Sequence, residues 1–194
     1  MNKYNDLIEF DPLPRILDFS FRWQVEEQPT GLWSKLTGQD KPVDLDAACL
    51  MLDRTGGVLD TIWFGNLRAQ DESVRHSGDR FYPDDQPITQ QLAQETIEVH
   101  LVNLADSVES LWFAVCAYHG HAVGRIRQLE CQISEGRRDR NLAMIQLDLD
   151  RQDDASGLLI ARLYRDASHH EGWSVQALAE PVDVRTPDEL GKII

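Results

Sequence analysis

The chain has 194 residues, of which 42% are hydrophobic and 27% charged, a composition typical of a soluble globular protein with one domain of β-sandwich size. Acidic residues outnumber basic ones by 33 to 19, and the formal net charge of −14 attracts cations and disfavours nucleic acid and anionic lipid as direct partners. No apolar run is long enough for a membrane helix, and the N-terminus lacks the basic-then-apolar order of a signal peptide, so we expect a cytoplasmic protein without membrane insertion.

The first clear element of the chain is a strand that begins at Leu17. Residues 1–15 contain two prolines and are predicted to lead into the domain, which we place at residues 16–180. From Leu17 to Val25 apolar residues alternate with polar ones, and this period of two predicts a strand with one buried face. Trp23 belongs to the apolar series, so we expect its ring in the core.

The next two predicted strands form a hairpin. Residues 43–51 alternate apolar positions with Asp44 and Asp46, which is the pattern of a half-buried strand. The pair Gly56-Gly57 supplies a tight reversal, because glycine adopts positive φ without steric cost. Residues 58–64 then return as a second apolar strand.

The rest of the chain is also rich in strand patterns. Residues 87–96 begin with proline and are predicted to form one or two helical turns. Alternation returns at Ile97, and further strands are predicted at residues 111–118, 125–134, 141–149, 157–165 and 173–179, the first of them central. About nine short strands with hardly any helix predict an all-β fold, an antiparallel sandwich. Residues 181–194 form a tail in which Thr186-Pro187 can begin a short helix.

The residue types that commonly form redox, zinc or nucleophilic sites are not spaced for such a site in this sequence. Cys49, Cys116 and Cys131 lie in apolar strand patterns without CxxC spacing, so we expect free, buried thiols. The histidines at residues 119–121 and 169–170 are predicted to lie in turns, because no acid or cysteine is spaced to complete a zinc site. With no serine elbow and no glycine-rich phosphate loop, the sequence predicts a protein that is not an enzyme.

One block of the sequence carries a family resemblance. It contains Asp44-Leu45-Asp46-Ala47, then Trp63-Phe64-Gly65-Asn66-Leu67, then Asp71 with Ser73-Val74, and ends with His76-Ser77-Gly78-Asp79. In this order and spacing the block resembles the TerD-like family of tellurium-resistance and general stress proteins. The resemblance implies a β-sandwich of two sheets and a role in the stress response, together with other proteins of a stress-response system.

The resemblance also implies a calcium loop after Gly78. Calcium takes six to eight oxygen ligands, and family members supply them from a loop rich in aspartate and glycine that ends in a glutamate. Here the candidate metal ligands are Asp79 at the start of the loop, Glu95 at its end, Asp84 and Asp85 between them, and Asp46 on the neighbouring strand.

Between its two ends this loop departs from the family pattern. Arg80 replaces an asparagine and puts a positive charge beside Asp79, and no glycine remains from Arg80 to Glu95. Two interpretations stay open: a weak calcium site, with calcium as the only expected cofactor, and a solvated acidic loop without metal. Asp44 and Asp46 share one face of their strand, where they either face solvent or lean toward the loop as ligands.

The same loop contains a candidate surface for binding a partner protein. Arg80, Phe81 and Tyr82 are consecutive, and their residue types are enriched at interface hot spots. Together with the family resemblance, which alone implies the stress role, these residues favour a non-enzymatic stress-response module that acts by cation-tuned protein interaction. The alternative is a calcium-independent scaffold that uses the same sandwich as a docking surface.

Overall fold

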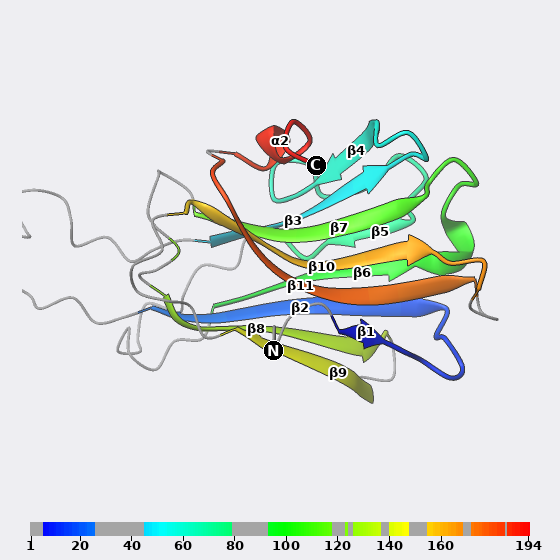
Figure 1. Cartoon of the computed structure of the whole chain (residues 1–194), viewed down its shortest axis with the longest axis horizontal. Coiled ribbons are helices and arrows are strands. Elements are labelled where there is room, and N and C mark those ends of the chain that lie inside the picture. Colours follow the sequence, from blue (N-terminus) through cyan, green and yellow to red (C-terminus); the bar gives the residue numbers. More distant parts are fainter. Residues whose placement is uncertain are drawn as a thin grey trace, which may run out of the picture.

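The computed structural model is a sandwich of two antiparallel β-sheets (Figure 1). It describes residues 6–25, 45–78, 93–117, 123, 126–136, 140–147, 155–168, 172–184 and 186–194. The all-β, two-sheet fold predicted from the sequence is confirmed. In the part of the chain that is described, no helix is long and apolar enough to cross a membrane.

The larger sheet has six strands in the order β1-β11-β10-β7-β3-β4. Their bounds are β1 (Leu7–Ile8), β3 (Leu45–Leu52), β4 (Val58–Ile62), β7 (Ser110–Ala117), β10 (Gly157–Arg165) and β11 (Trp173–Val182). The apolar run predicted as a central strand is β7, which pairs with β3 on one side and β10 on the other.

The smaller sheet has five strands in the order β5-β6-β2-β8-β9. Their bounds are β2 (Ile16–Val25), β5 (Val74–His76), β6 (Ala93–His100), β8 (Ile126–Glu135) and β9 (Arg140–Leu147). A short 3-10 turn, η2 (Leu101–Asn103), follows β6, and the predicted C-terminal helix is present as α2 (Pro187–Leu190). The described residues hold eleven strands; the two shortest, β1 and β5, were not predicted.

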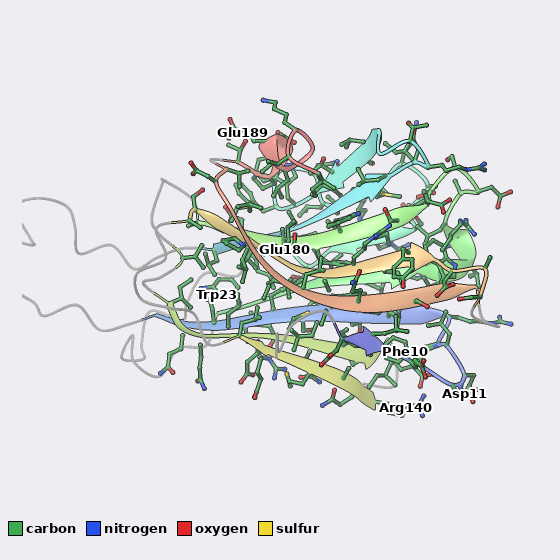
Figure 2. All side chains as sticks on the ribbon, in the orientation of Figure 1. Phe10, Asp11, Trp23, Arg140, Glu180 and Glu189 are labelled. Atoms are coloured by element: carbon green, nitrogen blue, oxygen red, sulfur yellow. The ribbon has the colours of Figure 1, made fainter. Side chains whose placement is uncertain are left out.

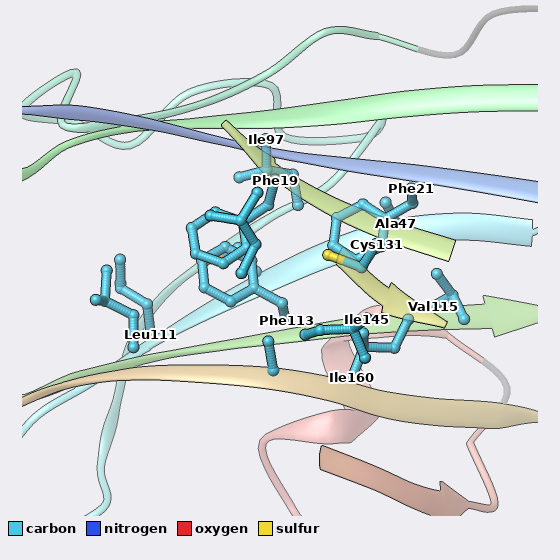
Figure 3. Close-up of a cluster of buried hydrophobic side chains, with 14 of the residues drawn as sticks. Phe19, Phe21, Ala47, Ile97, Leu111, Phe113, Val115, Cys131, Ile145 and Ile160 are labelled. Carbon is cyan, nitrogen blue, oxygen red and sulfur yellow. The ribbon is translucent and has the colours of Figure 1, made fainter. Parts of the chain in front are cut away.

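The main core lies between the two sheets and is built by alternation along the strands. Phe19, Phe21 and Trp23 of β2 are at most 2% exposed, as the period of two predicted. Phe19 stacks on Phe113 of β7, and aliphatic side chains from both sheets surround the pair (Figure 3). Burial of these apolar side chains is the main stabilising term of the fold.

The prediction of a half-buried β3 is wrong, because all eight of its residues are buried. A second apolar cluster covers the outer face of the six-stranded sheet, and it contains Leu50 of β3 together with Val184 and Leu190 of the C-terminal segment. This segment leaves β11 and reaches α2, which lies beside β3 and β4 (Figure 1). Ser156 holds it in place, since its Oγ accepts a hydrogen bond from Val184 N at 2.7 Å.

The helical turns predicted for residues 87–96 are wrong where the structure describes them. Residues 93–96 are the first half of β6 and pair with β2, with Ala93 opposite Trp23 and Thr96 opposite Ser20. Tertiary pairing here overrides a weak local helical preference. Residues 87–92 lie outside the described residues. The three cysteines are free and buried, as predicted.

Candidate functional site

Two of the predicted metal ligands, Asp46 and Glu95, lie within the described residues. Asp79, Asp84 and Asp85 lie outside them, as do the predicted partner-binding residues Arg80, Phe81 and Tyr82. Asp46 stands near the start of β3 and Glu95 near the start of β6. Glu95 is opposite Phe21, close to the end of β2 where Trp23 lies (Figure 2).

Glu95 connects the two sheets of the sandwich. It belongs to the five-stranded sheet, is 3% exposed, and its Oε2 accepts a hydrogen bond of 2.7 Å from the backbone N of Ala47 in the six-stranded sheet. A hydrogen bond to an ionised carboxylate is stronger than one between neutral groups, and a buried N–H without a partner is costly. The carboxylate therefore satisfies a backbone donor of β3 and joins β6 to it.

His76 is the second group at this carboxylate. Its side chain is fully buried, and its Nε2 lies 3.3 Å from Glu95 Oε2, an electrostatic contact that is longer than a good hydrogen bond. Its Nδ1 accepts a hydrogen bond of 3.0 Å from Gly78 N, so the neutral ring carries its proton on Nε2, on the side of the carboxylate. Gly78 has φ of +86°, a conformation that favours glycine.

Asp46 directly precedes Ala47 in β3. It is 4% exposed, so of the two interpretations left open for Asp46, the one in which it faces solvent is wrong. In the ladder it is opposite Cys116 of β7. Burial, and then the charge of Asp46, raise the pKa of the Cys116 thiol to about 12. The structure thus brings Asp46 and Glu95 to the same end of the sandwich, through Ala47.

The described residues do not by themselves fit a calcium site. Among them, no three histidine, cysteine or acidic side chains are grouped so that they could hold a metal ion. Glu95 Oε2 is already engaged by Ala47 N and faces the imidazole of His76, and nitrogen is not a ligand that calcium prefers. On this geometry Glu95 is a structural contact between the sheets.

A polar hollow of about 370 Å³ lies next to this contact, on the five-stranded sheet. It is lined by Asp18, Arg75, His76, Ser77, Gln94, Thr96 and Glu98. The hydroxyl of Ser77 accepts from Thr96 N at 3.0 Å, while His76 Nδ1 is taken by Gly78 N. Ser77 is therefore not arranged with His76 as a nucleophile with its general base.

His76 is the site residue that sequence reasoning missed. It stood inside the family block, directly before Ser77-Gly78-Asp79, without an assigned role. The available signal was its place two residues before a glycine, at the end of the segment Val74-Arg75-His76. Such an amide can reach back to the ring, as Gly78 N does here.

Comparison with known proteins identifies a matching family model and two similar proteins. A model of the TerD domain matches residues 9–186. The tellurium resistance protein TerZ of Serratia marcescens is 30% identical over 174 residues, covering 90% of this chain and 84% of TerZ. The stress response protein SCP2 of Bacillus subtilis (strain 168) is 26% identical over 182 residues, covering 89% of this chain and 86% of SCP2.

Solved structures agree in fold. A homologue of the telluride resistance protein TerD, SCO6318 from Streptomyces coelicolor A3(2), superposes with a TM-score of 0.65 at 17% identity, over 92% of this chain and 98% of its own. A crystal structure of a protein of unknown function, SAV2460, gives the same TM-score at 14% identity, over 92% and 97% of the two chains. At these identities the likeness establishes the fold alone.

Proposed function

Because this chain belongs to the TerD domain family, we propose that it is a non-enzymatic stress-response protein of the tellurium-resistance type. It acts as an acidic interaction module in the cytoplasm, binding other proteins of a stress-response system. The similarity to TerZ and SCP2 over about nine-tenths of the chain is the observation that carries this proposal.

The geometry of the described residues supports binding over catalysis. The two buried side chains at the candidate site are engaged by backbone amides: Glu95 accepts a hydrogen bond from Ala47 N, and His76 accepts one from Gly78 N. A catalytic pair needs a nucleophile within hydrogen-bond reach of a base, with both open to a substrate. His76 and Glu95 are instead buried; Glu95 joins β6 to β3, and His76 lies against the Glu95 carboxylate.

Cations tune the module weakly. The net charge of −14 draws cations to the surface, and Asp79, Asp84 and Asp85 remain the candidate calcium ligands of the loop. Arg80 and the missing glycines oppose tight binding, so we expect a dissociation constant no tighter than about 10⁻⁴ M. Calorimetric titration of metal-stripped protein measures it; tight stoichiometric binding that Asp79→Ala abolishes would contradict a weak site.

We assign binding of the partner protein to Arg80, Phe81 and Tyr82. The test is tellurite tolerance of cells that lack this protein, supplied with the wild type or with all three residues replaced by alanine. We expect the wild type to restore tolerance and the triple variant to fail while its thermal unfolding stays that of the wild type. Equal complementation by both proteins would remove the loop from the function, and no rescue by the wild type would reject the stress role.

The second candidate function is a calcium-independent scaffold, favoured by the engagement of Glu95 in a contact between the sheets. Capture of the partner in calcium, and in a chelator of calcium, separates the two candidates. Equal capture in both conditions supports the scaffold. Capture that falls several-fold in the chelator supports cation tuning.

A further inference from the structure

A second hollow, of about 360 Å³, lies beside β4 at the edge of the six-stranded sheet. β3 and β4 form one side of it, and two loop segments complete it, residues 69–71 before β5 and residues 105, 107 and 108 before β7. Its wall is mostly apolar, with Met51 and Val108 among the lining residues. A hollow of this volume is large enough to take a small ligand or one side chain of a partner.

A β-bulge places Leu59 at this hollow. Met51 pairs with Asp60 and Leu52 pairs with Val58, so Leu59 is the extra residue of β4 at the register shift. Its side chain lines the hollow and is 46% exposed. Leu59 therefore offers an apolar surface that the fold itself does not bury.

Two carboxylates, those of Asp60 and Asp71, also line the hollow. Asp60 Oδ1 accepts hydrogen bonds from Thr61 N and Asn66 Nδ2, and Asp71 Oδ1 accepts from Ser73 N and Oγ. Each carboxylate is thus held through one oxygen, and its Oδ2 has no hydrogen-bond or ion-pair partner within the described residues. The described lining contains no lysine, arginine or histidine.

The two arginines that border the lining are engaged elsewhere. Arg165 donates from Nε to Val108 O at 2.8 Å and from Nη2 to Ala105 O at 3.2 Å, so it fixes this part of the wall. Arg68 is paired with Glu72, with Nη1 and Oε1 3.7 Å apart. The wall is therefore preorganised, which lowers the ordering cost of binding, and its unneutralised charges are negative.

We propose that this hollow binds a lysine side chain of a partner protein. The apolar stem of a lysine lies along the wall at Leu59, and the carboxylates of Asp60 and Asp71 neutralise its ammonium group. Arginine pairs best with a carboxylate through both oxygens, whereas here one oxygen of each carboxylate is already engaged, which favours the point charge of lysine.

The charge of the whole chain supports a basic partner. A net charge of −14 attracts a segment that carries lysine and repels an acidic one. The hollow is also a surface other than residues 80–82, so this inference does not depend on the proposed function.

Titration of the whole ¹⁵N-labelled chain with short peptides, followed by NMR at about 0.15 M salt, is the test. The probe is a peptide with blocked ends and one lysine between alanines. We expect shifts confined to residues around the hollow and a dissociation constant on the order of 10⁻³ M. Norleucine in place of lysine keeps the apolar stem without the charge, and this peptide should bind at least about tenfold more weakly.

Two pairs of variants separate the charge from the apolar wall. Asp60→Asn and Asp71→Asn each keep the Oδ1 acceptor, and each should weaken the lysine peptide about three- to fivefold. Glu180→Gln, on β11 at the other side of the sheet, loses the same charge and should bind like the wild type.

Leu59→Ala should weaken the lysine and norleucine peptides alike, because it removes apolar surface from the wall. Leu67→Ala is its matched control, since Leu67 is 43% exposed but is not among the described lining residues, and it should change neither affinity.

Equal binding of the lysine and norleucine peptides overturns the proposal, and so does equal binding by the wild type and Asp60→Asn. Shifts that spread over the whole surface and ignore the variants also overturn it, because they indicate general attraction of cations to an acidic protein. A free diamine, cadaverine, that binds more tightly than the peptide assigns the hollow to a small amine and rejects a protein partner. The dispersion of each variant's NMR spectrum confirms that it is folded.

Discussion

The ring of Phe19 stacks on the ring of Phe113 across the two sheets, with centroids 3.8 Å apart and an angle of 15° between the ring planes. Phe19 lies on β2 and Phe113 on β7, strands with a neighbour on each side in their own sheets. Both side chains are fully buried. The pair therefore joins the inner strands of the sandwich at its centre.

Truncating this pair should be among the costliest changes in the protein. Phe113→Ala should lower the free energy of unfolding by about 3–5 kcal/mol, because it leaves a cavity between the sheets. A double-mutant cycle with Phe19→Ala, measured by denaturant unfolding, should give a coupling of about 0.5–1.5 kcal/mol for the aromatic contact. Additive losses would mean that the two rings do not interact.

Glu95→Ala should destabilise the protein in the absence of any metal. It leaves Ala47 N buried without an acceptor, which costs about 1–3 kcal/mol. Glu95→Gln is the matched control, because its amide oxygen can still accept from Ala47 N, and it should cost less than the alanine variant. Chemical denaturation in a chelator gives both values. Equal losses in the two variants would contradict the role of the hydrogen bond.

The three thiols should be inert in the native protein. Burial raises the pKa of Cys49, Cys116 and Cys131, that of Cys116 to about 12, and a thiol reacts as its thiolate. Alkylation near pH 8 should modify none of them quickly, and all three after unfolding, as intact mass will show. Fast modification of one thiol in the native state would mean that its strand opens locally.

The turn that joins β3 to β4 should weaken in acid. Hydrogen bonds from the Thr55 side chain, Gly57 N and Thr55 N lower the pKa of Asp53 below its ordinary value. A carboxyl group with a lowered pKa in the folded state stabilises it above the unfolded pKa, and this contribution is lost as pH falls through the folded pKa.

Asp53→Asn keeps an oxygen acceptor in this turn but does not titrate. The melting temperature of the wild type should exceed that of Asp53→Asn at neutral pH, and the gap should close below pH ~4. The effect should be small, since Asp53 is partly open to solvent, which screens its charge. A gap that stays constant across this pH range would contradict the assignment.

The C-terminal segment should contribute to stability through Leu190. This side chain is fully buried in the second apolar cluster, so Leu190→Ala should cost about 2–5 kcal/mol. Ile193, three residues further along and 51% exposed, is the matched control, and Ile193→Ala should change stability by less than about 0.5 kcal/mol. Thermal unfolding of both variants checks this. Similar losses of stability in the two variants would mean that burial of Leu190 against the six-stranded sheet does not stabilise the fold.

Strand positions could be predicted from the sequence because alternation is a local signal. β2 shows this best: its apolar series from Leu17 to Trp23 is the buried face. The burial of β3 on both faces could not be predicted in the same way. Asp46 and Ala48 looked like the solvent side of the strand, and the segment that covers Leu50 from outside comes about 140 residues later.

The candidate metal site stays a prediction, and the structure describes only two of its residues. Asp46 and Glu95 do lie at one end of the sandwich, but their proximity arises from Ala47 N meeting Glu95 Oε2, a contact between sheets that no local pattern encodes. The buried position of His76 was equally hidden, because its sequence neighbours Arg75 and Ser77 are both polar and give no sign of burial. The remaining predicted ligands, at residues 79, 84 and 85, lie outside the described residues and stay predictions.

The order β5-β6-β2-β8-β9 has a consequence for how fast the protein folds. β2 forms no hairpin with a sequence neighbour; it pairs with β6, as in the Ser20–Thr96 hydroxyl contact 76 residues apart, and with β8 beyond that. Each pairing closes a long loop of chain before it gains contact energy, and topologies of this kind refold in milliseconds to seconds. β2 carries two open edges until residues 93–100 have been synthesised and one until residues 126–135 follow, and in that interval the nascent chain is most exposed to aggregation.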